Sequence, residues 1–255
     1  MEKIVMGVLM MFLFGGVSEA TQTKITVRAK AKDAKFIGST MAGALVIIKD
    51  SETGEVLAKG FTTGGTGNTQ KIMTEPVRRG VAITDNSAAK FETTIDIAEP
   101  KFVTIEIYAP YGQRQSMAKN TTQVWLIPGK DITGEGIIVD VYGFSIAVLA
   151  PQAHETLKLI DGKIKVPVRA NVMMMCGCPI TPGGIWDANK YEVKAIVKCN
   201  DAVSAVIPLA FANKTSTFEG MLEVTKEGAY EVTVYSFDPI TGNSGVDRTT
   251  FIAVK

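Results

Sequence analysis

Hydrophobic and polar residues alternate with a period of two along most of this 255-residue chain. In the segment Lys-Phe-Val-Thr-Ile-Glu-Ile-Tyr at 101–108, Val103, Ile105 and Ile107 fall on one side of an extended backbone. Residues 163–172 alternate in the same way. Because successive side chains of a β-strand point to opposite faces, this pattern places one face in a core and the other in water. It predicts an all-β protein built from antiparallel β-sandwiches.

Turns rich in glycine and proline divide the chain into short strands, for example at 51–54, 128–129 and 182–184. The expected strands are 23–29, 43–50, 54–61, 79–83, 90–97, 101–108, 122–128, 136–142, 144–149, 155–160, 163–175, 190–199, 203–208, 216–224, 229–237 and 246–254. One helical turn is expected near 85–90. An immunoglobulin-sized sandwich uses seven to nine strands in about 100 residues, so these strands suit two sandwiches in tandem.

The first twenty residues differ from the rest of the chain. Lys3 gives a positive start, 4–17 is an uncharged apolar run, and Ser18-Glu19-Ala20 places small residues where a signal peptidase cleaves. This is the anatomy of a secretory signal peptide. The run is shorter than the roughly 20 apolar residues that a spanning helix prefers. We therefore expect export to the periplasm or the extracellular space, with no membrane span in the mature chain.

The charges of the chain balance, with 27 Lys and Arg against 26 Asp and Glu and a net charge of +1. A non-specific nucleic-acid binder needs a basic stripe that displaces counterions from phosphates. The composition therefore argues against nucleic acid as a partner.

The predicted organisation is a signal peptide at 1–20, one sandwich at 21–149 and a second sandwich at 150–255. The boundary is placed at Ala150-Pro-Gln-Ala-His154. Because the strand pattern is continuous from 136 to 149, the junction is expected to be short and stiff rather than a flexible linker.

Two segments resemble known β-sandwich families. Residues 43–54 (Gly-Ala-Leu-Val-Ile-Ile-Lys-Asp-Ser-Glu-Thr-Gly), with Gly-Phe-Thr-Thr-Gly-Gly at 60–65, resemble the opening of transthyretin-like and carboxypeptidase-regulatory-like domains. Residues 228–234 (Gly-Ala-Tyr-Glu-Val-Thr-Val), with Asp238 and Thr-Gly-Asn at 241–243, resemble the penultimate strand of bacterial Ig-like domains. The resemblances imply a transthyretin-like first sandwich and an Ig-like second one, with the tyrosine at a strand corner. They bear on the fold and assign no activity.

The chemically unusual segment is Met-Met-Met-Cys-Gly-Cys-Pro at 173–179. The alternation of the preceding strand puts Met174, Cys176 and Cys178 on the inward side, and the next strand puts Cys199 inward as well. All three cysteines are therefore expected to meet at one end of the second sandwich, with the intervening methionines facing outward.

Three interpretations of these residues remain open. In an oxidising compartment Cys199 can form a disulfide with Cys176 or Cys178, which is worth about 3 kcal/mol in the chain-entropy model. Alternatively Cys176, Cys178, Cys199 and the Met174 thioether form a soft site that selects copper(I) or zinc. The third interpretation is inert or redox-active thiols. Only the second implies a cofactor.

Trp186 and Asp187 close a Gly/Pro-rich loop and are the predicted binding loop. An indole in such a loop can be a platform for a sugar ring or a peptide, or it can plug the open end of the sandwich. Trp125 lies within an alternating strand and is expected in the core.

Other candidate motifs are weak. Thr-Thr-Gly-Gly-Thr-Gly-Asn-Thr at 62–69 lacks the Lys of a Walker loop and is expected to be a surface loop. His154, the single histidine, has no local catalytic partner. Asp238, Asn243 and Asp247 carry oxygen ligands suited to Ca²⁺, but a solvated turn is the favoured explanation.

No residue pattern supplies a nucleophile with its base, so the chain is not expected to be an enzyme. We expect an exported binding or assembly module that holds an envelope or extracellular protein, or a surface polymer, through sheet edges and end loops. The alternative is a periplasmic soft-metal-binding protein that uses the Met-Cys-Gly-Cys segment. The oligomeric state is left open.

Overall fold

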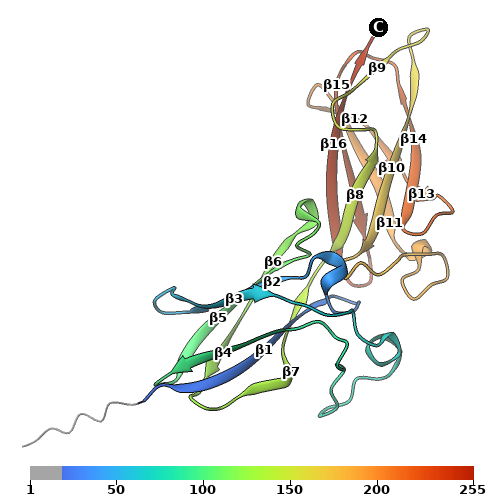
Figure 1. Cartoon of the computed structure of the whole chain (residues 1–255). Coiled ribbons are helices and arrows are strands. Elements are labelled where there is room, and N and C mark those ends of the chain that lie inside the picture. The colour runs from blue at the N-terminus through green and yellow to red at the C-terminus, as the bar shows by residue number, and fades with distance from the viewer. Residues whose placement is uncertain (1–18) are drawn as a thin grey trace, which may run out of the picture.

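Figure 1 shows the computed structural model, which describes residues 19–255. The predicted signal peptide at 1–20 lies outside the described residues except for Glu19 and Ala20, which are exposed. The first strand begins at Thr21, which is also the first residue expected after cleavage. Among residues 19–255, no helix has the length and apolar character needed to cross a membrane.

The first sandwich packs two sheets face to face. One has the order β4–β1–β7, in which β1 pairs antiparallel with β4 and parallel with β7. The other is antiparallel, with the order β3–β2–β5–β6. β3 also contacts β4, and β6 contacts β7, so the sandwich is closed along both sides. The strands are β1 (Thr21–Ala31), β2 (Leu45–Asp50), β3 (Val56–Phe61), β4 (Phe91–Ile97), β5 (Lys101–Ala109), β6 (Ala118–Leu126) and β7 (Ile132–Val141).

The predicted alternation accounts for the core of this sandwich. Val103, Ile105 and Ile107 of β5 are fully buried, and Ile48 and Val46 of β2 lie opposite Ile105 and Ile107 in the ladder. Burying each such side chain stabilises the fold by about 1.5–3 kcal/mol relative to leaving it in water. The all-β fold class is confirmed.

The second sandwich has a four-stranded sheet of order β13–β14–β10–β8 and a five-stranded sheet of order β12–β11–β15–β16–β9. Its strands are β8 (Phe144–Ala150), β9 (Glu155–Lys158), β10 (Ile164–Met174), β11 (Glu192–Cys199), β12 (Ala202–Pro208), β13 (Ala210–Phe211), β14 (Thr217–Val224), β15 (Gly228–Phe237) and β16 (Ser244–Val254). The chain passes from β8 in the first of these sheets to β9 at the edge of the second, where β9 pairs parallel with β16.

The strand order of the second sandwich is immunoglobulin-like. Lettered in chain order, with β9 left out, β8 and β10 to β16 become strands A, B, C, C′, D, E, F and G. The two sheets are then ABED and C′CFG. The Tyr230 hydroxyl donates to the Lys226 carbonyl oxygen at 2.9 Å, directly before strand F. This is the tyrosine corner of Ig-like sandwiches, and it confirms the strand corner expected from the 228–234 segment.

The boundary between the sandwiches lies before the position predicted at Ala150. β8 pairs with β10 from Phe144↔Met174 to Ala150↔Arg169 and so belongs to the second sandwich. The chain crosses at Gly143, whose φ of +122° suits glycine and where a Cβ would lie 2.8 Å from the Ser244 carbonyl oxygen. The continuous strand pattern concealed this crossing because β7 and β8 follow each other almost directly.

Residues 62–90 form a long excursion between β3 and β4, and here two predictions were wrong. Residues 79–83 form no strand, and the one helical turn of this excursion, η2, is a π-turn at Gln70–Thr74 rather than at 85–90. Arg28 on β1 anchors the excursion by donating to the carbonyl oxygens of Ala88 and Ala89, and it also bonds those of Gly134 and Glu135. Loss of hydration lowers the pKa of this buried guanidinium, yet each of its three nitrogens donates to at least one carbonyl oxygen.

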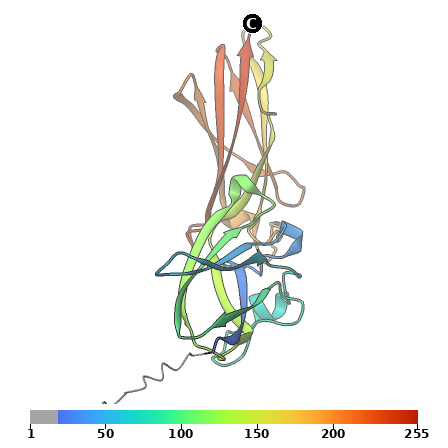
Figure 2. The same ribbon diagram turned by 60° about the vertical axis from the view of Figure 1, so that its left-hand side comes forward.

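The sandwiches join end to end with a bend (Figures 1 and 2). The short helix η3 (Arg114–Ser116) of the first contacts β8 and β16 of the second. Ser116 Oγ donates to the Ile146 carbonyl oxygen at 3.0 Å, and Asn243 Nδ2 donates to that of Lys32 at 3.0 Å. One hydrophobic core runs through both sandwiches. The junction is therefore a packed interface rather than a linker.

Candidate functional site

The Met-Cys segment lies at the junction between the sandwiches. Met174, Met175, Cys176 and Cys178 are all buried, and a disulfide joins Cys176 to Cys178, whose Cα atoms are 5.4 Å apart. Met175 was expected to face outward, but it is buried, and its Cε lies 3.2 Å from the position of a Cβ on Gly143, where the chain crosses between the sandwiches. The segment turns at Gly177, where φ is +78° and a Cβ would lie 2.7 Å from Met41 Sδ of the first sandwich. These sulfur atoms therefore serve as interface packing.

Cys199 does not join this cluster, contrary to the sequence prediction. Tyr191, directly before β11, packs on Phe144 at the junction with ring centroids 5.0 Å apart, and β11 then runs away to end at Cys199. Eight strand residues span about 25 Å. Cys199 is a free thiol. The predicted disulfide from Cys199 to Cys176 or Cys178 is therefore wrong.

The predicted metal site shares this error. Its ligands were Cys176, Cys178, Cys199 and Met174, which the fold does not bring together, and two of them are bonded to each other. Within residues 19–255, no three His, Cys, Asp or Glu side chains group closely enough to hold a metal ion. The alternation placed the three cysteines on the core side, where the structure also has them. It gave no indication of which end of the sandwich each cysteine would reach.

The predicted binding loop is also part of the junction. Trp186 is only 6% exposed, and its Nε1 donates to the Asp33 carbonyl oxygen at 2.9 Å across the interface. Asp187 accepts from the backbone N–H groups of Gly183 at 2.9 Å and Asn189 at 3.0 Å, which lowers its pKa. The indole is a plug rather than a platform, and the carboxylate is a loop cap.

The remaining candidates have structural partners. Asp238 accepts from Thr241 Oγ1, Asn243 Oδ1 accepts from Gly143 N–H, and Asp247 Oδ2 accepts from Val148 N–H. These bonds use the oxygens that a Ca²⁺ site would need. His154 is exposed beside Thr250, with 3.5 Å between Nδ1 and Oγ1.

A different surface, missed from the sequence, gathers side chains suited to binding. We call it the outer face: the side of the β3–β2–β5–β6 sheet that points away from the core. Its side chains are Val56, Lys59 and Phe61 of β3, Leu45, Ile47 and Lys49 of β2, Phe102, Thr104, Glu106 and Tyr108 of β5, and Lys119, Thr121, Gln123 and Trp125 of β6.

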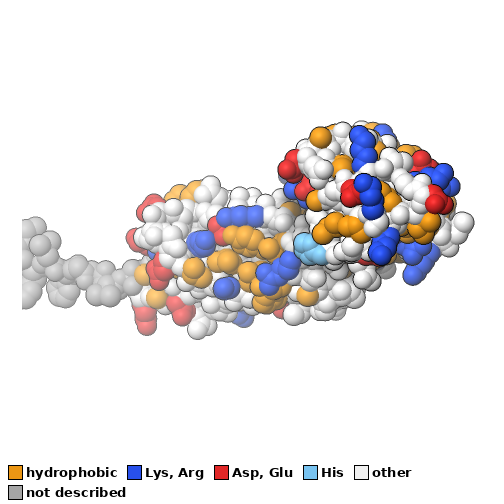
Figure 3. All heavy atoms as spheres, turned by 90° about the horizontal axis from the view of Figure 1, so that it is seen from above, with side chains coloured by type: hydrophobic (Ala, Val, Ile, Leu, Met, Phe, Trp, Pro, Cys, Tyr) orange, Lys and Arg blue, Asp and Glu red, His pale blue; other side chains and the backbone are white. Residues whose placement is uncertain are grey.

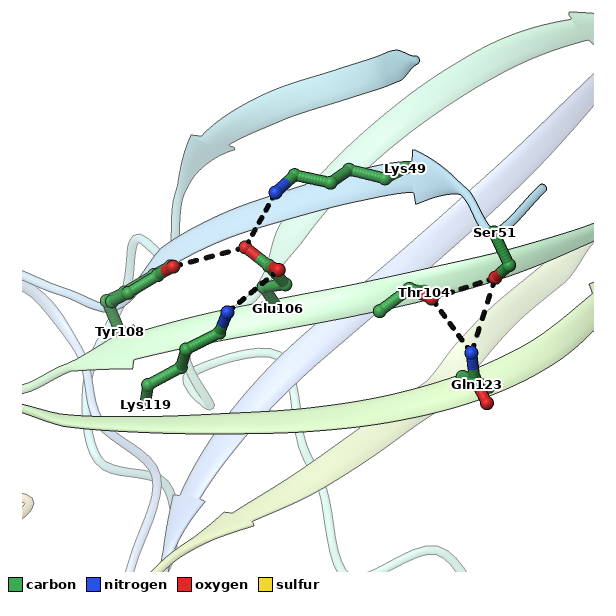
Figure 4. Close-up of polar contacts among 7 residues, drawn as sticks. All are labelled: Lys49, Ser51, Thr104, Glu106, Tyr108, Lys119 and Gln123. Atoms are coloured by element: carbon green, nitrogen blue, oxygen red, sulfur yellow. Dashed lines mark hydrogen bonds and ion pairs between the residues drawn. The ribbon is translucent and has the colours of Figure 1, made fainter. Parts of the chain in front are cut away.

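Glu106 organises the centre of the outer face (Figure 4). Its carboxylate accepts from Lys119 Nζ at 2.9 Å, Lys49 Nζ at 3.0 Å and Tyr108 OH at 3.1 Å. The Lys119 bond is the largest of the effects that lower the pKa of Glu106, so the carboxylate stays ionised. Because all its partners are donors already in place, Glu106 fixes its neighbours and is not poised as a general base.

Figure 4 shows a second polar group on this sheet, next to the Phe102–Trp125 pair in the register of the β5–β6 ladder. Ser51 Oγ and Thr104 Oγ1 are 2.8 Å apart, and Gln123 Nε2 donates to Thr104 Oγ1 at 3.0 Å. Within each of these two groups, the polar side chains hold one another in fixed positions.

Aromatic rings lie at both ends of the outer face. At the end near the second sandwich, Phe61 meets Tyr111 at 4.8 Å between centroids, and the Arg114 guanidinium lies 3.9 Å from the Tyr111 centroid. At the other end, Phe102 and Trp125 are 5.0 Å apart. Seen from above in Figure 3, hydrophobic side chains flanked by Lys and Arg cover this side of the first sandwich.

Trp125 is 55% exposed, although it was predicted to lie in the core. The next residue, Leu126, is fully buried, so strand alternation turns the indole outward. That signal was present in the sequence. The continuous apolar run Val-Trp-Leu-Ile at 124–127 obscured this signal. Apolar residues occupy both faces of the strand there, so either face could be taken as the buried one.

No family model matches the chain, and no curated protein is similar to it. Among solved structures, fibronectin(III)-like modules of Clostridium thermocellum CbhA are similar at a TM-score of 0.30 and 9% identity, over 91% of this chain and 94% of that chain. A likeness this distant carries no argument. The Ig-like assignment of the second sandwich rests on its strand order and its tyrosine corner.

Proposed function

We propose that this chain is an exported, non-enzymatic binding module that holds an envelope component or surface polymer against the outer face. The observation that supports this most is the exposure of Trp125 (55%) and Phe61 (43%) on a sheet whose other face packs against the core. Large apolar side chains left in water on one continuous surface mark an interaction site more often than scattered ones do.

The geometry of the outer face favours binding by a preformed surface. The side chains of Lys49, Lys119 and Tyr108 are already fixed on Glu106, so a partner orders few of them when it binds. Lys59 is exposed and has no ion pair within residues 19–255, which leaves its charge available to a partner.

The face is a better candidate than the sheet edges that were expected from the sequence. In the first sandwich β3 contacts β4 and β6 contacts β7, so both edges are covered by neighbouring strands. A partner strand cannot extend an edge that is already covered. The flat outer face remains open.

Sedimentation with envelope material from the native host tests the proposal. The purified protein should co-sediment with the envelope fraction, and the double variant Lys59→Glu with Phe61→Ser should bind at least tenfold more weakly. The matched control makes the same chemical changes on the second sandwich, at Lys214→Glu with Phe237→Ser, where both side chains are exposed. Absence of binding by the wild-type protein, or equal binding by the two double variants, would contradict the proposal.

A further inference from the structure

A small cleft opens beside Trp125 at the end of the outer face. Its volume is about 190 Å³, below the roughly 300–1,000 Å³ of pockets that enclose drug-sized ligands. It is lined by Asp50, Glu52, Glu99, Pro100, Lys101, Phe102 and Trp125. A space of this size suits one ring or one side chain of a larger molecule.

The indole that borders the cleft is held firmly. Phe102 and Trp125 lie opposite each other in the β5–β6 ladder, with centroids 5.0 Å apart and ring planes inclined by 37°. Phe102 is partly buried, so it supports one side of the indole while 55% of Trp125 remains open to solvent. A rigid aromatic ring of this kind offers a flat, weakly negative π-face to a ligand at little entropic cost.

The polar groups of the cleft include both donors and acceptors. Lys101 Nζ bonds Asp50 Oδ2 at 2.7 Å, while Asp50 Oδ1 accepts from the backbone N–H groups of Glu52 at 2.9 Å and Thr53 at 3.2 Å. Asp50 thereby accepts three hydrogen bonds and fixes the Lys101 ammonium, which keeps further N–H donors for a ligand. Glu52 and Glu99 are exposed acceptors without an ion pair within residues 19–255.

We propose that this cleft binds one uncharged pyranose ring of a glycan, stacked on Trp125 and hydrogen-bonded by Lys101, Glu52 and Glu99. The inference rests on the proposed function and names the ligand class of the same face. One side of a pyranose ring presents C–H groups, which suit the negative π-face of an indole, and its rim carries hydroxyls that both donate and accept.

The charged side chains of the cleft distinguish a neutral sugar from an anionic sugar and from a basic peptide side chain. The lining carries three carboxylates against one ammonium, so an anionic sugar meets net repulsion. A basic peptide side chain is attracted by the same net charge, but it needs acceptors only, so it leaves the Lys101 donors unused and brings its cation towards the Lys101 ammonium. A neutral ring with vicinal hydroxyls is the ligand that uses the Lys101 donor and the glutamate acceptors together.

Tryptophan fluorescence can report on this cleft directly because the chain has only two tryptophans. In a Trp186→Phe variant all indole emission comes from Trp125. Titration with cellohexaose, xylohexaose and mannohexaose should change this emission and protect Trp125 from acrylamide quenching for at least one of the three. Oligogalacturonate should bind at least tenfold more weakly than that oligosaccharide, and hexalysine should not protect.

Variants of the full chain, measured by calorimetry, assign the binding to the cleft. Trp125→Ala should weaken binding at least tenfold, and Trp125→Phe should weaken it less. Phe237→Ala is the matched control, since Phe237 is a 40% exposed aromatic side chain on the second sandwich. Glu99→Gln should raise the affinity for oligogalacturonate relative to the neutral oligosaccharide, because it removes one repelling charge.

Several results would overturn the sugar site: no binding of any neutral oligosaccharide, tighter binding of oligogalacturonate or hexalysine, or an unaffected Trp125→Ala variant. The envelope assay separates this failure from that of the proposed function. If the Lys59/Phe61 double variant fails to sediment while no oligosaccharide binds, the sugar site falls and the proposed function stands. If oligosaccharides bind through Trp125 while the wild-type protein does not sediment with the envelope, the sugar site stands and the envelope function falls.

Discussion

Trp186 plugs the junction, one of the two roles that its sequence left open, whereas Trp125 lies outside the core in which it was predicted. Trp186 follows a loop of prolines and glycines, yet it is 6% exposed and donates a hydrogen bond across the junction. Trp125 lies in an alternating strand, yet it is 55% exposed. The difference arises because a loop at the end of one sandwich can be covered by another sandwich, whereas one side of a strand in a two-layer fold always faces outward.

The same contrast holds for the regions around the two tryptophans. At the junction, the side chains with the most reactive chemistry, Cys176 and Cys178, are buried and bonded to each other. On the outer face, ordinary residues such as Glu106 and Lys119 form a fixed and accessible arrangement. Reactive residue types thus serve packing in one region, and the candidate function lies in the other.

Replacing each tryptophan by alanine should give the largest difference in stability loss between the junction and the outer face. Trp186→Ala should lower the free energy of unfolding by about 3–5 kcal/mol, because it leaves a cavity in the interface. Trp125→Ala should lower it by less than about 1 kcal/mol, since the indole is largely in water already. Guanidinium denaturation followed by far-UV circular dichroism measures both values. Equal losses in the two variants would mean that the regions do not differ as described.

The Trp186→Phe variant sharpens this measurement. It keeps most of the ring volume but removes the N–H that bonds the Asp33 carbonyl oxygen. A loss of about 1 kcal/mol is expected, the net value of one hydrogen bond. A loss as large as that of Trp186→Ala would assign the role of Trp186 to the hydrogen bond rather than to packing.

The alternation predicted what is local and missed what depends on distant parts of the chain. Most strand positions and the buried face of β5 follow from neighbouring residues, and the corner at Tyr230 was implied by the resemblance to Ig-like domains. Which end of the sandwich Cys199 reaches depends on the direction of β11 after a long loop. Met175 lies in the turn directly after β10, so its burial does not follow from the alternation of that strand.

Reduction of the Cys176–Cys178 disulfide should have the next largest effect on stability. Native, unreduced protein should contain one alkylatable thiol, Cys199, and denatured, reduced protein should contain three. Reduction should lower the free energy of unfolding by only about 1.5 kcal/mol, because the Cys176–Cys178 bridge closes a very short loop. Intact-mass analysis after iodoacetamide treatment counts the thiols. Three native thiols, or protection of Cys199, would show that the bridge is placed incorrectly.

The carboxylates beside the two tryptophans should respond to pH in opposite directions. The bond from Lys101, with those from two backbone N–H groups, lowers the pKa of Asp50 to about 2. A carboxylate with a depressed folded-state pKa stabilises the fold above its unfolded pKa, near 4, and this stability is lost as pH falls towards 2. The stability difference between wild type and Asp50→Asn should therefore be largest at neutral pH and vanish near pH 2, as measured by urea denaturation across this range.

Asp33, on the rim of the junction, is the opposite case and gives the smallest effect. Loss of hydration and then repulsion from Asp238 raise its pKa. The unfolded chain therefore ionises first, and stability falls as pH rises from the unfolded pKa through the raised folded value. Asp33→Asn removes this cost and tolerates the left-handed backbone at this residue, where φ is 56°.

Because Asp33 is exposed to solvent, water and salt screen most of this cost, and a gain of only a few tenths of a kcal/mol is expected at pH 7. At pH 3 the carboxyl is protonated in both states, so wild type and Asp33→Asn should be equally stable. The comparison needs paired urea titrations at both pH values, with and without added salt, which should shrink the gain by screening Asp238. An Asp33→Asn variant that is less stable than wild type at pH 7 would mean that the Asp33 carboxylate stabilises the junction, as Asp50 stabilises the end of the outer face.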